Sequence, residues 1–147
     1  MTLYESGTPG HELEPTDALK AAVLISNKGT GSNLRAILDA IDSKQLPNIT
    51  VPLVLSDKPD ALGLNHAKEH EIPFGICPFE KPTHVGAEGI QEARRLYGLS
   101  VARYLNQNGI DVAVMAGFGT ILPQSFFDLF AGVAINLHPG YVPDKGD

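Results

Sequence analysis

The sequence has 147 residues, of which 43% are hydrophobic and 19% charged, as is typical of one soluble globular domain. Its formal net charge of -6 argues against general binding to nucleic acid or to an anionic membrane surface. No apolar run approaches the roughly 18 residues of a membrane-spanning helix. The single cysteine, Cys77, excludes an intrachain disulfide framework and fits a reducing compartment. We therefore expect a soluble, cytoplasmic protein.

Residues 1–19 mix glycine, proline and acidic residues without a helical or strand period. We expect them to form an N-terminal tail. Residues 20–147 are expected to form a single α/β domain, because they contain no internal repeat, low-complexity tract or linker.

The first ordered segment predicts a strand, a glycine-rich loop and a helix. Residues 21–25 (AAVLI) form a short apolar run, typical of a strand buried on both faces, and the loop SNKGTGSN follows. Ser32 is the expected N-cap of the next helix, whose first free amides carry partial positive charge and suit a phosphate. Neither a third glycine nor Gly-Lys-Ser/Thr is present, so the loop matches neither the dinucleotide fingerprint nor the P-loop. A tight turn without a ligand is the alternative.

Strand and helix patterns alternate through the rest of the chain. Pro52 suggests a bulge or a sheet edge in the second strand, and Asp60 is the expected cap of the second helix. This alternation predicts a Rossmann-like parallel sheet with flanking helices and right-handed crossovers. The expected elements are strands at 47–56, 74–78, 111–116 and 133–135, and helices at 60–71, 90–108 and 124–130.

The last strand is followed by two polar residues that could carry chemistry. Residues 133–135 are expected to be a buried strand, and Asn136 and His138 follow at its carboxyl end, where open α/β sheets bind ligands. Side chains two apart on an extended backbone point the same way. An amide donor beside an acid–base histidine suits a reaction that builds negative charge on a carbonyl oxygen. A turn-forming asparagine and a surface histidine are the alternative.

A metal site is not predicted. His66 and His70 lie four residues apart on an expected helix, a spacing that can bind zinc. No His-Glu-x-x-His pattern or nearby cysteine accompanies them, so we interpret them as part of a solvated helix face.

The chain resembles the phosphoribosylglycinamide formyltransferases of purine synthesis from about Lys20 onward. Four segments carry the resemblance: LISNKGTGSNLRAILDA, LSDKPDALGLNHA, DVAVMAGFGTIL and INLHPGYVP. It implies the formyltransferase fold, with the last strands of that fold missing after Asp147. It also implies a transferase of one-carbon metabolism, acting as a monomer or homodimer.

The resemblance implies a role for each matching residue. The glycine loop would hold the substrate's phosphate, a second group would bind 10-formyltetrahydrofolate, and two residues would be catalytic. The phosphate-binding residues would be Gly31, Ser32 and Asn33. The folate-binding residues would be Arg94 (with Arg95 as its substitute), Gly119, Thr120, Ile121, Leu122 and Asn136. The catalytic residues would be Asn136 and His138. The implied reaction transfers the formyl group to the amine of glycinamide ribonucleotide, with no metal.

Two departures from the family pattern leave alternatives open. The family usually has Met-Arg where this chain has Gly119 and Thr120, and its catalytic aspartate lies well beyond the histidine, whereas this sequence ends at Asp147. The chain could instead be another formyl-folate transferase or a deformylase of the same fold. A third reading is a phosphoribosyl-ligand binder that lacks the catalytic aspartate.

Overall fold

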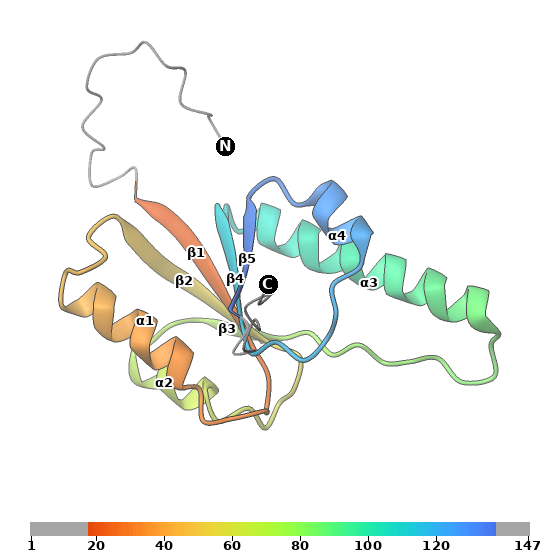
Figure 1. Ribbon diagram of the computed structural model, residues 1–147, viewed down its shortest axis with the longest axis horizontal. Coiled ribbons are helices and arrows are strands. Elements are labelled where there is room, and N and C mark those ends of the chain that lie inside the picture. The colour runs from red at the N-terminus through yellow and green to blue at the C-terminus, as the bar shows by residue number, and fades with distance from the viewer. Residues whose placement is uncertain (1–17, 138–147) are drawn as a thin grey trace, which may run out of the picture.

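The computed structural model describes residues 18–137, and in this range five parallel strands alternate with four helices (Figure 1). The predicted α/β class with a parallel sheet is therefore confirmed. The strands lie side by side in the order β3-β2-β1-β4-β5. The elements are β1 Leu19–Ile25, α1 Ser32–Asp42, β2 Ile49–Ser56, α2 Leu64–Glu69, β3 Phe74–Ile76, α3 Ala87–Gln107, β4 Val112–Ala116, α4 Gln124–Leu129 and β5 Val133–Leu137.

The central strand β1 is buried on both faces, as its continuous apolar run predicts. Ala22 and Leu24 pack into the layer formed with α3 and α4, whereas Val23 and Ile25 pack into the layer formed with α1 and α2. Figure 1 shows the two helix pairs on opposite faces of the sheet. Because both faces bury apolar side chains, β1 is the strand around which both cores are built.

The bulge suggested by Pro52 is present. Lys20 pairs with Thr50 but Ala22 pairs with Leu53, so β2 has one more residue than β1 at this point. The strand is not an edge, since β3 also pairs with it, but that pairing begins only at Val54. Pro52 therefore lies where the missing amide removes no bond to β3.

The strand β5 differs from its prediction as a buried strand. Val133 is 43% and Ile135 is 46% exposed. These residues lie opposite Val112 and Val114 of β4, and β5 is the outer strand of the sheet. Within residues 18–137 no further strand pairs with it, and this leaves the apolar side chains of Val133, Ile135 and Leu137 exposed.

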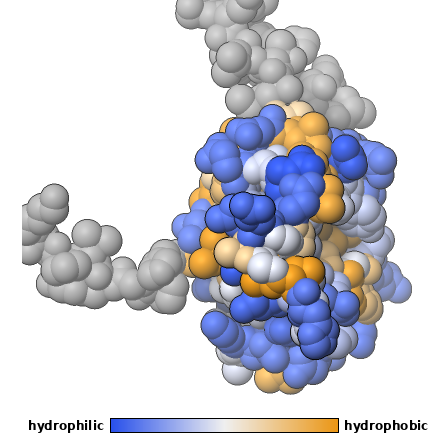
Figure 2. Space-filling view, turned by 90° about the vertical axis from the view of Figure 1, so that its right-hand side faces the viewer, coloured by the Kyte–Doolittle hydropathy of each residue, from blue (hydrophilic) through white to orange (hydrophobic). Residues whose placement is uncertain are grey.

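Two helices begin elsewhere than predicted. The helix α2 begins after Gly63, and Asp60 caps nothing but accepts bonds of 3.3 Å from the Asn27 amide. The helix α3 begins at Ala87, and its N-terminal end reaches outward from the strands (Figure 1). Hydrophilic residues cover most of the side formed by α3 and α4, with hydrophobic residues between them (Figure 2). No helix among the described residues is long and apolar enough to cross a membrane.

The helices α3 and α4 approach each other closely at Gly98. A Cβ atom at this position would lie 2.5 Å from Pro123 Cγ, 2.5 Å from Ser125 Oγ and 3.0 Å from the Phe126 amide nitrogen. The Phe126 nitrogen is a backbone atom of α4, and Pro123 Cγ belongs to a closed ring at the N-cap of α4, so neither can rotate away. Glycine is therefore required by contact, although it lowers helix propensity.

We predict that Gly98→Ala lowers the free energy of unfolding by about 1–3 kcal/mol, because overpacking outweighs the gain in helix propensity. The measurement is urea unfolding followed by circular dichroism. Gly86→Ala is the control, since nothing lies within 4 Å of a Cβ atom at the N-cap of the same helix. Equal or greater stability of Gly98→Ala would contradict the packing of α4 on α3.

Candidate functional site

Three adjacent strands bring the predicted site segments to one edge of the sheet. The glycine loop follows β1, residues 117–122 follow β4, and Asn136 lies near the end of β5. Neighbouring strands are about 4.8 Å apart, so the ends of β1 and β5 are separated by only about 10 Å. We name this group the carboxyl-edge site. Its position fits the rule that open α/β sheets bind ligands beyond the carboxyl ends of their strands.

The glycine loop leaves the first turn of α1 uncapped. The N-cap is Gly31, not Ser32 as predicted, because the helix already begins at Ser32. Gly31 adopts a left-handed conformation (φ 78°), and no side chain caps the helix. A Cβ atom there would lie 2.4 Å from Gly63 Cα. The Arg35 amide makes the first helical bond, to the Gly31 carbonyl at 3.0 Å. The three preceding amides have no helical acceptor, so they are available to an anion.

The segment after β4 is partly buried and partly open. Leu122 is 7% exposed and packs against α3 and α4, whereas Ile121 is 78% exposed. The Thr120 hydroxyl donates a 2.8 Å hydrogen bond to Asp57 Oδ2. Among the described residues, this segment offers one face to a ligand but does not enclose it.

Asp57 is a buried carboxylate next to the carboxyl-edge site that the sequence analysis did not single out. It follows β2 directly, is 2% exposed, and donates its amide to the Ile25 carbonyl at 3.3 Å. Its Oδ1 atom is buried and has no hydrogen-bond partner among the described residues. A buried polar atom without a partner costs about 1–3 kcal/mol. Its only sequence signal is an acidic residue directly after a buried strand.

The structure describes Asn136 of the predicted catalytic pair. Asn136 is exposed on β5, opposite Met115 of β4, and alternation puts it on the same face as Ala134, which packs toward α3 and α4. His138 lies outside the described residues. Their convergence therefore stays a prediction.

The two arginines on α3 make contacts outside the carboxyl-edge site. The Arg94 guanidinium lies over the Phe79 ring, 5.5 Å from its centroid. Arg95 donates two bonds to Glu92, at 2.7 and 2.8 Å, and this hydrogen bonding lowers the pKa of the Glu92 carboxyl. No hydrogen bond or ion pair among residues 18–137 joins Arg94 to Thr120 or Asn136, so its folate-binding role stays a prediction.

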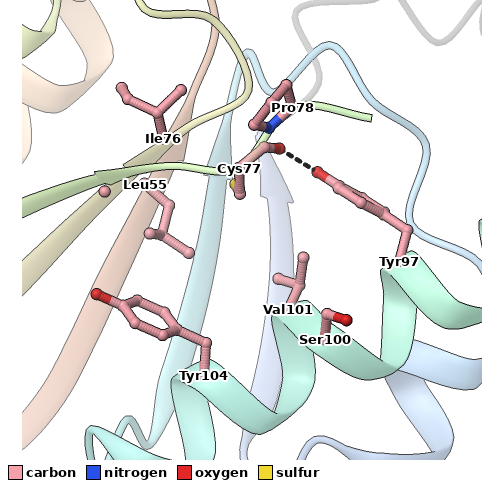
Figure 3. Close-up of a pocket in the computed structure, with 9 residues that line it drawn as sticks. Leu55, Ile76, Cys77, Pro78, Tyr97, Ser100, Val101 and Tyr104 are labelled. Atoms are coloured by element: carbon pink, nitrogen blue, oxygen red, sulfur yellow. Dashed lines mark hydrogen bonds between the residues drawn. The ribbon is translucent and has the colours of Figure 1, made fainter. Parts of the chain in front are cut away.

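A cavity of about 450 Å³ lies between β3 and α3 (Figure 3). The Tyr97 hydroxyl donates a 2.7 Å bond to the Cys77 carbonyl at one end of it. Its walls come mainly from β3, the residues after it and α3, and none of the predicted site residues lines it. The lining residues are Leu55, Gly75, Ile76, Cys77, Pro78, Tyr97, Ser100, Val101 and Tyr104.

Burial dominates the proton affinities around this cavity. It raises the pKa of the Cys77 thiol to about 11, with a smaller rise from the charge of Asp57 and an opposing effect of Tyr97. Burial also raises the pKa of the Tyr97 phenol well above its usual range, and Thr120 opposes this rise. The charge of Asp57 thus acts on both groups. Within residues 18–137 no three His, Cys, Asp or Glu side chains form a metal-binding group.

We predict that Cys77 reacts with iodoacetamide at pH 8 at least 100-fold more slowly in the folded chain than in urea. At pH 8 a thiol of pKa about 11 is about 0.1% thiolate, whereas an unfolded thiol of pKa about 8.5 is about a quarter thiolate. The measurement is the alkylation rate by mass spectrometry, which should rise steadily from pH 8 to 10. Similar rates in the two states would contradict the burial of this thiol.

Comparison with known proteins finds relatives that match most of this chain. Phosphoribosylglycinamide formyltransferase of Dictyostelium discoideum is 39% identical over 123 residues, a match that covers 80% of this chain and 57% of that protein. The Escherichia coli protein of the same name is 35% identical, with 85% of this chain and 53% of that protein covered. The chain thus spans somewhat more than half the length of these relatives.

A solved structure shows the same fold. The phosphoribosylglycinamide formyltransferase of Coxiella burnetii superposes with a TM-score of 0.68 at 30% identity, covering 88% of this chain and 56% of that one. The model of the formyl transferase family matches residues 19–144, which include all five strands of the sheet. This chain belongs to the formyl transferase family.

Proposed function

We propose that the chain takes part in transferring a formyl group from 10-formyltetrahydrofolate to the amine of glycinamide ribonucleotide. The observation that carries the proposal is the position of the glycine loop, residues 117–122 and Asn136 at the carboxyl ends of three adjacent strands. A phosphate-bearing substrate and a formyl donor could meet there within about 10 Å. The relatives named phosphoribosylglycinamide formyltransferase support the same assignment.

The glycine loop would bind the phosphate of the ribonucleotide. Its first-turn amides have no helical acceptor, and Ser32 and Asn33 are exposed beside them. These amides and the partial positive charge of the α1 N-terminus attract an anion without a basic side chain. The net charge of -6 is therefore no obstacle to binding an anionic substrate.

The folate would bind against the backbone of residues 119–122, which Leu122 anchors to the core. It would supply the formyl group, and the residues of the chain would position that group and stabilise the charge formed on its oxygen. The exposed face of Ile121 leaves room for a flat ring system. Arg94 is the candidate for a carboxylate of the folate, because a guanidinium pairs with carboxylates in a two-pronged geometry.

Asn136 and His138 would act on the reacting centre. As the amine attacks the formyl carbon, the carbonyl oxygen becomes negative, and the Asn136 amide would donate a hydrogen bond to it. His138 in its protonated form would donate a second one and then help move the amine proton to the departing nitrogen. The carbon–nitrogen bond to the folate breaks as that nitrogen receives the proton.

The proposal is tested by mixing the chain with glycinamide ribonucleotide and the formyl donor, with calorimetry for binding and mass spectrometry for the formylated product. Binding with formylation supports the transfer function. Ribonucleotide binding without formylation favours the phosphoribosyl-binding alternative. Formate release without ribonucleotide favours a deformylase.

We predict that Ser32→Asp raises stability and weakens ribonucleotide binding. A carboxylate in the first turn interacts favourably with the helix dipole, by about 0.3–1 kcal/mol, but repels a phosphate. The expected loss in affinity is about tenfold or more, measured by isothermal calorimetry. Ser32→Asn is the neutral control, and the riboside without phosphate should bind both variants equally. An unchanged ribonucleotide affinity of Ser32→Asp would show that the phosphate does not bind at this loop.

We predict that Asn136→Ala lowers turnover by about 10²–10³-fold, the usual loss for one oxyanion donor, while leaving the unfolding midpoint unchanged. No hydrogen bond of the Asn136 side chain supports the fold among the described residues, and the residue is exposed. The measurement pairs initial rates with thermal unfolding. Turnover at the wild-type rate would show that Asn136 does not stabilise the transition state.

A further inference from the structure

The hydrogen bond between Thr120 and Asp57 connects two loops that are not neighbours. Asp57 follows β2 and Thr120 follows β4, and β1 lies between these strands in the sheet. The bond of 2.8 Å therefore spans the carboxyl end of β1, where the glycine loop begins. A Cβ atom at Gly119 would lie 2.9 Å from Ser26 Oγ and 3.1 Å from Asp57 Oδ2, so the three segments are in close contact.

Burying the Asp57 carboxylate lowers the stability of the fold. Asp57 is 2% exposed, and its second oxygen has no partner among the described residues. No Lys, Arg or His within residues 18–137 forms an ion pair with it. A neutral side chain of the same shape would fill the space without burying a charge. A carboxylate at this position needs an explanation other than stability.

We propose that Asp57 is a positioning residue of the carboxyl-edge site. Through Thr120 it fixes the backbone of residues 119–122 relative to the start of the glycine loop, and so aligns the surface for the folate-type ligand with the surface for the phosphate. A carboxylate holds a hydroxyl about twice as strongly as a neutral acceptor does. This inference rests on the proposed function, because it assigns the folate-type ligand to residues 119–122.

Asp57 lies too far from the end of β5 to act there as a catalytic carboxylate. It follows β2, which is three strands from β5, and three strand spacings amount to about 14 Å. Its carboxylate is also buried and committed to Thr120. Its effect on the reaction is therefore indirect, through the position of the loop.

The test compares three variants of the full chain in two measurements. Asp57→Asn keeps the shape and an acceptor oxygen but removes the charge; Thr120→Val removes the donor; Thr120→Ser keeps the hydroxyl. Asp111→Asn is the matched control, because Asp111 accepts a bond from the Lys20 amide at the opposite end of the sheet. The measurements are the thermal unfolding midpoint and the affinities, by calorimetry, for glycinamide ribonucleotide and for the stable analogue 10-formyl-5,8-dideazafolate.

The inference predicts that stability and folate-analogue affinity change independently. Asp57→Asn should unfold at or above the wild-type midpoint yet bind the analogue about fivefold more weakly, as expected for a neutral acceptor. Thr120→Val should unfold at a lower temperature, because it leaves both carboxylate oxygens without donors from residues 18–137, and should bind the analogue about tenfold more weakly. Thr120→Ser should restore both values, and ribonucleotide affinity should stay unchanged in all variants.

Each failure has a distinct meaning. A lower midpoint for Asp57→Asn would show that the carboxylate supports the fold, and this result overturns the inference without involving any ligand. Wild-type affinity for the analogue in Asp57→Asn and Thr120→Val would also overturn it while leaving the proposed function intact. If the wild type binds the ribonucleotide but not the analogue, the proposed formyl transfer fails, and the inference fails with it.

Discussion

The burial of β1 on both faces is the constraint on which the rest of the structure depends. Five consecutive apolar residues, 21–25, supply side chains to the α1–α2 layer and to the α3–α4 layer at once. Because the flanking strands run parallel to β1, every loop that follows a strand emerges at the same edge. The glycine loop, residues 117–122 and Asn136 come together as a consequence of this topology. The site segments after β1 and on β5 are more than 100 residues apart in the sequence, and the hydrophobic packing of the sheet brings them together.

The carboxyl edge also holds the buried polar side chains of the described residues. Ser26 follows β1, Ser56 ends β2 and Asp57 follows it, and Asp57 has a buried oxygen without a partner among the described residues. Elsewhere in the described part of the chain, buried side chains are almost all apolar. Proteins accept such departures where a ligand will supply the missing interactions. The location of these departures thus supports the same edge as the binding site, independently of any sequence comparison.

Features that depend on local sequence were predictable, and those that depend on distant contacts were not. The strand at 21–25, the loop and helix after it, and the bulge at Pro52 follow from short-range patterns. The exposure of Ile135 was missed because it depends on whether another strand pairs with β5. Asp57 was missed because its partner Thr120 is 63 residues away in the sequence. The cavity beside Tyr97 was also invisible, since it forms between β3 and α3.

The most direct test of the account is a map of backbone amide chemical shifts as glycinamide ribonucleotide is added to the isotope-labelled chain. The account predicts shifts at Gly31, Ser32, Asn33 and Leu34, with inorganic phosphate perturbing the same four amides. Adding the folate analogue to the ribonucleotide complex should then shift residues 119–122 and Asn136. Shifts confined to the cavity lined by Tyr97 and Tyr104, or no shifts at the start of α1, would contradict the assignment of the carboxyl edge as the substrate site.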